Sequence, residues 1–376
     1  MLALEKLKKY SLKSPSMIIG PIGLSFSLEN LHLVQLQKLA DGSISLRAKA
    51  SAKYPMDLDE LQNSPKEIKR IVSQLIKLDH FYGNEVVSAL PPGKCRLLPI
   101  AYQKNPDKQE SQLIVNALTN RLDGDLNDYV IDYLLVRSSA ENENCLALVA
   151  TAKRESVIAY LENLRRASLN VTALEVNPAA IKRLVVSMSS EKHENVLVIN
   201  FGQVKSFFTM ISGDRLIFDH EVEFGEKDLL EKVANDLELS ESEVSELIQR
   251  YGLLPDADQL SEEGELSGAE IANIMAEIVR PKFVEISEEI NRALIYIASE
   301  TRGGSANEIY MLGSIARWQG ADQILRSLLH VEVITIPDIL TRFPRQTSHN
   351  NREESSCSAE IAVATGLALR GLLHNE

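Results

Sequence analysis

A β-β-β-α pattern that occurs twice, about half a chain apart, constrains the fold of this sequence more than any other feature. In each copy, three runs of strand-forming residues are separated by short turns and followed by a helical pattern. The first copy has its runs at Met17–Leu24, Leu31–Gln37 and Ser43–Ala48. The second copy has them at Val196–Ile199, Ser206–Ile211 and Arg215–Glu223. Two copies of one unit predict a duplicated α/β fold with two lobes.

Length and composition agree with two lobes and exclude several functions. A chain of 376 residues is too long for one ordinary domain. The net charge of −13 argues against nucleic-acid binding, which depends on phosphate contacts. The cysteines Cys95, Cys145 and Cys357 are scattered, and the histidines lack metal-ligand spacing, so we expect neither disulfides nor a metal site. Without an apolar run of ~20 residues or a signal-peptide core, the chain is expected to be cytoplasmic.

The first 16 residues form a separate arm. Its segment Met1–Lys13 combines several leucines with four lysines. This pattern is typical of a basic amphipathic tail that rests on an anionic membrane. A solvated, frayed arm is the alternative interpretation.

A region between parts of the first lobe has a β-α-β-β-α-β order of its own. Strands are predicted over Cys95–Tyr102, Tyr129–Arg137, Cys145–Ala152 and Val171–Val176, with helices over Lys108–Leu122 and Arg154–Ser168. This order is typical of a small α+β module, here inserted into the lobe. The predicted division is an arm at 1–16, a first lobe at 17–94 and 175–192, a module at 95–174 and a second lobe at 193–376.

The second lobe contains a predicted helical subdomain at about 226–302. Its main element is a long helical pattern over Gly268–Glu300, which Pro281 is expected to kink or split because proline removes a backbone donor. A closing helix is predicted over Ala359–Leu373.

Four segments carry a resemblance to a known family. They are Val149–Glu155, Val176–Ala180, Glu289–Leu294 and, closest of all, Ala364–Arg370. With the duplicated units and the inserted module, they resemble the type IV pilus assembly protein PilM family, including its relatives, the MshI proteins of mannose-sensitive haemagglutinin pili. The resemblance implies an actin-like (ASKHA) two-lobe fold related to that of the division protein FtsA, and a nucleotide cleft between the lobes.

The family motifs of that cleft are altered here. The first hairpin of the family reads Gly-Ile-Asp-Ile-Gly-Ser-Ser, and its acid and second glycine fall at Ser25 and Ser27. In the second hairpin, Asp-Ile-Gly becomes Asn200-Phe201-Gly202, and the adenosine-side glycine run begins Gly313-Ser314. Two family lysines fall at His32 and Ile248.

These changes remove both carboxylates and two cations. Magnesium is held in such sites through carboxylates, and a triphosphate needs cations to balance its charge. We therefore expect a degraded nucleotide site, with no cofactor and no catalytic residue, in which Ser25–Leu28 and Asn200–Gln203 are tight turns that join the lobes. The alternative is a slow ATPase that binds ATP and magnesium with its acid relocated to Glu29 or Glu221. A sugar or small-acid kinase would need a catalytic carboxylate that is not evident.

The resemblance also implies a partner. In the PilM family, a cleft between the first lobe and the module takes the short cytoplasmic N-terminal segment of the membrane protein PilN. The corresponding candidate residues here are Leu97, Leu98, Leu146 and Leu148. The implied protein is a pilus scaffold, peripheral at the inner membrane. Pilus motor or platform proteins and a second copy of the chain are further candidate partners, and nucleic acid is not.

Overall fold

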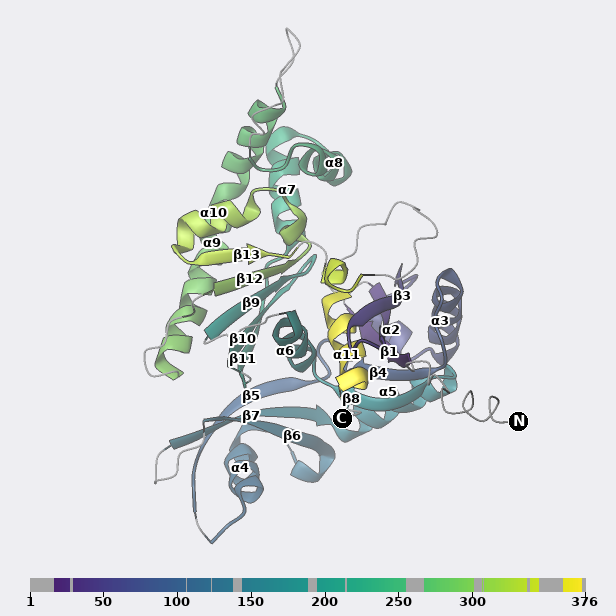
Figure 1. The fold of residues 1–376 in the computed structure, drawn as a ribbon. Coiled ribbons are helices and arrows are strands. Elements are labelled where there is room, and N and C mark those ends of the chain that lie inside the picture. Colours follow the sequence, from purple (N-terminus) through teal and green to yellow (C-terminus); the bar gives the residue numbers. More distant parts are fainter. Residues whose placement is uncertain are drawn as a thin grey trace, which may run out of the picture.

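The computed structural model shows two lobes with helices between them, and a smaller module beside the lobes (Figure 1). It describes residues 17–27, 30–105, 107–122, 124–137, 144–188, 195–213, 215–254, 267–300, 306, 308–336, 339–344 and 361–373. The predicted arm at Met1–Lys13 lies outside these residues, so both interpretations of the arm stay predictions.

Each lobe is built on a five-stranded sheet of the same design. In the first sheet, an antiparallel meander is extended by two parallel strands in the order β3-β2-β1-β4-β8. Its strands are β1 (Ile18–Phe26), β2 (Asn30–Lys38), β3 (Ile44–Lys53), β4 (Glu85–Ala89) and β8 (Asn170–Glu175).

The second sheet repeats this arrangement in the order β11-β10-β9-β12-β13. Its strands are β9 (Asn195–Phe201), β10 (Ser206–Ser212), β11 (Arg215–Val222), β12 (Glu308–Gly313) and β13 (Glu332–Thr335). Because both sheets place the third, second and first meander strands beside two parallel strands, the predicted duplication is confirmed.

Helices cover both faces of the sheets. One core joins the first sheet to α2 (Leu58–Gln62), α3 (Pro65–Leu78) and α5 (Arg154–Arg166). A second core joins both sheets to α6 (Asn177–Met188) and α11 (Ile361–Leu373), which lie between the lobes (Figure 1). A third core lies under α7 (Glu226–Leu237), α8 (Glu241–Tyr251), α9 (Gly268–Glu300) and α10 (Ala321–Leu329). The helix α9 continues through Pro281, so the proline does not split it.

The module is smaller than predicted. Its antiparallel sheet has the order β5-β7-β6, with strands β5 (Arg96–Gln103), β6 (Tyr129–Arg137) and β7 (Asn144–Lys153), and the helix α4 (Glu110–Leu118) packs on one face. The assignment of Val171–Val176 to the module is wrong, because β8 pairs in parallel with β4 of the first sheet. Its preceding helix α5 packs in the core of the first lobe.

The closing helix also lies elsewhere than the predicted division implies. Although α11 follows the second lobe in sequence, it packs against β1, β2 and β4 of the first sheet and against α6. Gly23 and Gly366 allow this close packing. A Cβ at Gly23 would lie 2.0 Å from the Ala364 oxygen, and one at Gly366 would lie 2.1 Å from the Ala180 oxygen.

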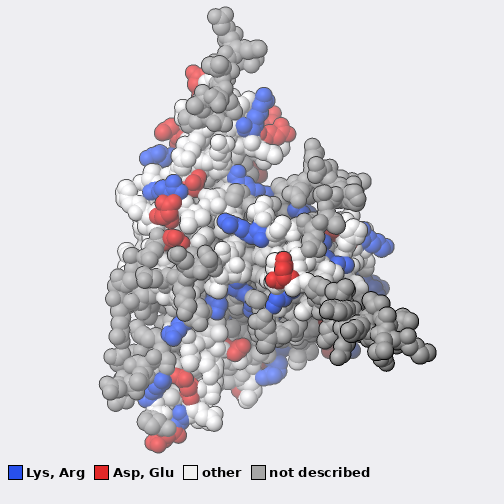
Figure 2. All heavy atoms as spheres, in the orientation of Figure 1, with Lys and Arg blue, Asp and Glu red and all other residues white. Residues whose placement is uncertain are grey.

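The surface charge is mixed on the face that Figure 2 shows. Basic and acidic side chains are interspersed there, so the net charge of −13 does not form a single acidic field on this face. None of the helices in the described part of the chain combines the length and the apolar character that a membrane span requires.

Candidate functional site

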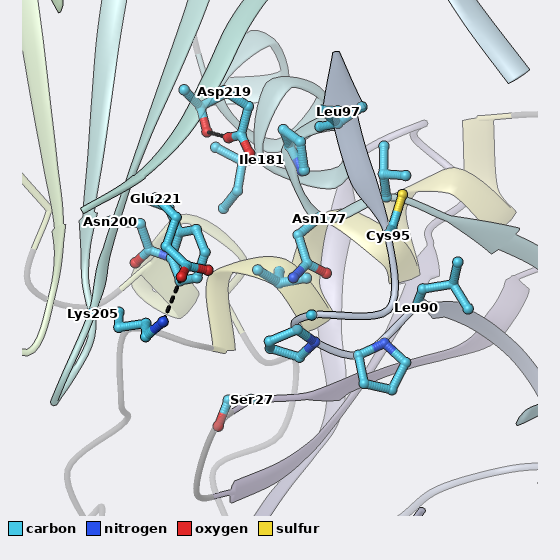
Figure 3. Close-up of a pocket in the computed structure, with 18 of the residues that line it drawn as sticks. Ser27, Leu90, Cys95, Leu97, Asn177, Ile181, Asn200, Lys205, Asp219 and Glu221 are labelled. Carbon is cyan, nitrogen blue, oxygen red and sulfur yellow. Dashed lines mark hydrogen bonds and ion pairs between the residues drawn. The ribbon is translucent and has the colours of Figure 1, made fainter. Parts of the chain in front are cut away.

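A cavity of about 380 Å³ lies where the two lobes meet the module (Figure 3). The ends of the two predicted phosphate hairpins line it, together with the start of α6 and the first residues of β5. Its described lining includes Ser25–Ser27, Leu90–Gly93, Cys95–Leu98, Val176–Pro178, Asn200, Gly202, Lys205, Phe207, Thr209 and Asp219–Glu221. The structure thus brings Ser25, Ser27, Asn200 and Gly202 together, as predicted for the inter-lobe cleft.

The turn of the first hairpin is closed by hydrogen bonds between its own residues. Ser25 lies within β1, opposite His32, and not in the turn. The Ser27 amide donates to the Asn30 oxygen over 2.9 Å, and the Ser27 hydroxyl donates to the same oxygen over 3.0 Å. The Asn30 amide in turn donates to Ser27 Oγ over 3.0 Å. The amide and the hydroxyl of Ser27 are therefore both used within the turn. Leu28 and Glu29 lie outside the described residues.

The second hairpin is fastened by Gly313 and Ser314, which do not line the cavity. The Gly202 amide donates to the Lys205 oxygen over 3.0 Å. The Ser314 amide donates to the Phe201 oxygen over 2.9 Å, and the Ser314 hydroxyl donates to the Gly202 oxygen over 3.0 Å. Gly313 has a φ of +116°, and a Cβ there would lie 2.4 Å from the Phe201 oxygen. These residues hold β12 against the end of β9.

One wall of the cavity is polar and comes from three neighbouring strands. Asn200 is opposite Phe207, which is opposite Glu221, so the three form one row across β9, β10 and β11. Thr209 and Asp219 belong to the adjacent row. Side chains at directly opposite positions share a face of the sheet. Figure 3 shows Asn200, Asp219 and Glu221 on this side of the cavity.

The carboxyl groups of this wall differ in their surroundings. Asp219 accepts a hydrogen bond of 2.7 Å from the Thr209 hydroxyl, and burial raises its pKa to about 7. The Lys205 Nζ lies 2.6 Å from Glu221 Oε1 and 2.7 Å from Glu223 Oε1. These hydrogen bonds, the one to Glu221 first, raise the pKa of Lys205.

The predicted partner-binding leucines separate into two pairs. Leu97 and Leu98 on β5 line the cavity, and they also pack against cores, Leu97 against that of the second lobe and Leu98 against that of the module. Leu146 and Leu148 on β7 are only 6% and 2% exposed and pack in the core of the second lobe with Val136. Their role in the described structure is to attach the module to that lobe. The sequence did not reveal this, because an apolar strand has the same residue pattern whether it lines a groove or lies at an interface between domains.

The duplicated sheets, with helices between the lobes and a cavity at the ends of the two hairpins, define an actin-like fold. Residues 23–372 match the family Type IV pilus assembly protein PilM, and the chain belongs to this family.

Solved structures agree with the fold. A chain of a "PilM-PilN type IV pilus biogenesis complex" is 23% identical, with a TM-score of 0.70 over 95% of this chain and 99% of that chain. The ethanolamine utilization protein EutJ from Carboxydothermus hydrogenoformans is 13% identical, with a TM-score of 0.53 over 93% of this chain and 90% of that chain. A nucleotide-free diol dehydratase-reactivating factor is 8% identical, with a TM-score of 0.52 over 96% of this chain and 100% of that chain.

Proposed function

We propose that the protein is a cytoplasmic scaffold of a type IV pilus assembly machine that docks the N-terminal segment of a PilN-like membrane protein. The observation that carries the proposal is the cavity where the two lobes meet the module, lined in part by Leu97 and Leu98. The similar PilM chain occurs in a complex with PilN, which supports this choice of partner. Docking such a segment would place the scaffold at the inner membrane.

The module side of the cavity suits an extended peptide. Leu90, Pro91, Leu97 and Leu98 give it an apolar floor. Among the described strands, β5 pairs only with β7, so its other edge has backbone groups available for an added strand. Backbone pairing supplies affinity in such complexes, and apolar pockets select side chains.

The same contacts argue against a magnesium triphosphate as the occupant. Phosphate sites on hairpins rely on free backbone amides. The amides of Ser27, Gly202 and Ser314 already donate within the protein. Asp219 and Glu221 would add negative charge beside the phosphates, and Lys205 is engaged by Glu221 and Glu223. Glu221, one of the two candidate acids of the ATPase alternative, is thus held in an ion pair. We propose a degraded nucleotide site and no cofactor.

The docking proposal is tested by fluorescence anisotropy with the labelled cytoplasmic segment of the PilN-like protein from the same genome. Leu97→Ala and Leu98→Ala should each weaken binding about tenfold, which is the effect of truncating one of the few residues that carry most of the binding energy of an interface. Leu134→Ala is the matched control, because Leu134 lies on the same module and is 45% exposed. Unchanged affinity in folded Leu97→Ala and Leu98→Ala would place the docking site elsewhere.

A thermal shift assay tests the nucleotide site. A ligand at a hundred times its dissociation constant stabilises a protein by about 2.7 kcal/mol. We expect no shift with millimolar ATP and magnesium. A clear shift that Asn200→Ala abolishes would favour the ATPase instead.

A further inference from the structure

One end of the first sheet carries exposed apolar side chains, close in sequence to the N-terminal arm. Met17, Ile18, Leu78 and Tyr82 are 48%, 43%, 73% and 65% exposed, and we call them the apolar patch. We infer that the apolar patch rests in the surface of a bilayer that contains anionic lipids. This contact is a second attachment to the membrane, separate from the proposed docking of a PilN-like segment.

The topology of the first sheet brings the four residues to one place. The strands β1 and β4 are parallel neighbours, so both begin at the same end of the sheet. Ile18 is the first residue of β1, and Met17 precedes it. Leu78 ends α3, and Tyr82 lies in the loop from α3 to β4. Figure 1 shows α3 on the side of the first lobe that faces away from the second lobe. The apolar patch therefore lies at an outer end of the first lobe.

Hydrogen bonds fix the backbone under the patch. The Tyr82 amide donates to Gln35 Oε1 over 2.8 Å. The Gln35 Nε2 donates to the Tyr82 oxygen over 2.8 Å and to the Gly20 oxygen over 2.9 Å, which places Tyr82 beside the start of β1. Next to Leu78, Asp79 accepts from the amide of Lys49 in β3 over 2.9 Å. The exposed side chains thus stand on a fixed surface, and neighbouring apolar residues exposed in this way mark interaction sites.

The sequence of the arm identifies a membrane as the occupant. Met1–Lys13 contains four lysines and several leucines, and it ends only four residues before Met17. Lysines close to an anionic bilayer are attracted to it, and apolar side chains beside them enter the boundary between headgroups and acyl chains. Tyrosine is favoured at that boundary, because its ring is apolar and its hydroxyl is polar. The arm and the patch therefore suit the same surface.

The charge of the chain is distributed so that this end can approach an anionic surface. Residues 1–192 contain 25 Lys and Arg against 21 Asp and Glu, whereas residues 193–376 contain 15 against 32. The net negative charge therefore belongs to the second half of the chain. Basic and acidic side chains are balanced at the end of the sheet that carries the patch: Lys38, Arg47, Lys77, Asp41, Asp79 and Glu85. The patch accordingly supplies apolar contact, and the arm supplies the preference for anionic lipids.

The membrane contact is compatible with docking in the cavity. Ser25–Ser27, which line the cavity, lie at the other end of β1 from the patch. The nine residues of β1 span about 30 Å. An extended segment of about ten residues covers that distance. A membrane protein can therefore place its cytoplasmic segment in the cavity while the patch rests on the bilayer.

Sedimentation of the full chain with vesicles of phosphatidylglycerol and phosphatidylcholine tests the inference. Leu78→Ser and Tyr82→Ser should each weaken binding about tenfold, which corresponds to withdrawing part of one large apolar side chain from the lipid. Ile295→Ser is the matched control, because Ile295 is 71% exposed but lies on α9 of the second lobe. Replacing the four lysines of the arm by glutamine should remove the preference over vesicles of phosphatidylcholine alone.

Tryptophan fluorescence reports insertion of the patch directly. Tyr82→Trp places a tryptophan in the patch, and the single natural tryptophan, Trp318, is buried and gives a constant background. With vesicles that contain phosphatidylglycerol, the emission of Tyr82→Trp should move to shorter wavelength, and brominated lipid should quench it. Ile295→Trp should show neither change.

Each outcome decides the inference without a partner protein. If the wild-type chain does not sediment with the anionic vesicles, or sediments equally with phosphatidylcholine alone, the membrane contact is overturned. If it sediments but folded Leu78→Ser and Tyr82→Ser bind as the wild type does, the arm alone makes the contact and the patch is overturned. Because no PilN-like segment is present, failure of the docking proposal appears only in the anisotropy assay.

Discussion

Glu175 joins the first sheet to the two helices that lie between the lobes. It stands at the end of β8 and accepts from Arg183 of α6 over 2.8 Å at Oε2 and 2.6 Å at Oε1. Arg370 of α11 donates to the same carboxylate. Arg183 also donates to the Gly366 oxygen of α11 over 3.0 Å. Replacing the carboxylate should therefore loosen three elements at once.

The expected loss in the free energy of unfolding follows from the burial of this ion pair. The Glu175 side chain is 6% exposed, and that of Arg183 is 16% exposed. Breaking a buried ion pair by removing one partner costs about 3–5 kcal/mol, because the remaining charge stays buried without compensation. Arg370 is partly solvated at 28% exposure, so we expect Glu175→Gln to lower the free energy of unfolding by about 3 kcal/mol, the low end of this range.

Urea denaturation followed by circular dichroism measures this loss. Glu162→Gln is the matched control, because Glu162 pairs with Arg166 on the exposed face of α5. Exposed pairs of this spacing contribute about 0.3–0.5 kcal/mol. If Glu175→Gln destabilises the protein no more than Glu162→Gln does, the ion pairs of Glu175 with Arg183 and Arg370 do not stabilise the fold as argued.

Three further substitutions test the packing of α11 on α6, the interface between the module and the second lobe, and the raised pKa of Asp219. Gly366→Ala should cost about 1–3 kcal/mol in urea denaturation, since the new Cβ would lie 2.1 Å from the Ala180 oxygen; an unchanged midpoint would contradict the packing of α11 on α6. Leu148→Ala should cost about 3 kcal/mol, whereas the exposed Leu134→Ala should cost under about 1 kcal/mol; equal losses would refute the interface between module and second lobe. Asp219→Asn should raise the melting temperature, because the raised pKa of Asp219 destabilises the wild-type protein wherever the unfolded chain ionises this carboxyl. The advantage of the variant should grow from about pH 5 to about pH 7 and stay constant above that pH. A constant difference across that range would show that Asp219 titrates normally.

The fold could be predicted because its main signal is local. The three strands of each meander are consecutive in sequence, so the runs and turns of both copies were visible. The positions of β8 and α11 could not be predicted. The strand β8 pairs in the first sheet and the helix α11 packs on it, and most of that sheet is distant from both in sequence. Periodicity gives the type of such an element but not the sheet on which it packs.

The site was predicted only in part. Family motifs located Ser25, Ser27, Asn200 and Gly202, and the structure brings these residues to one cavity. Asp219 was missed, because it becomes important only through burial. A carboxylate on a half-exposed strand looks ordinary in sequence, and its raised pKa depends on how the module covers β11.

The two lobes and the module that surround the cavity are attached to one another by packed contacts, so the cavity is preformed. The core around α6 and α11 is continuous between the two sheets. Val136, Leu146 and Leu148 attach the module to the second lobe, and Arg154 of α5 donates to the Asn127 and Tyr129 oxygens at the start of β6. Opening the cleft would separate buried apolar surfaces, at a cost of roughly 25 cal/mol for each Å² exposed. A preformed cavity lowers the entropic cost of binding an extended segment, because only the segment must become ordered. This arrangement favours steady docking of a partner over a cycle of opening and closing.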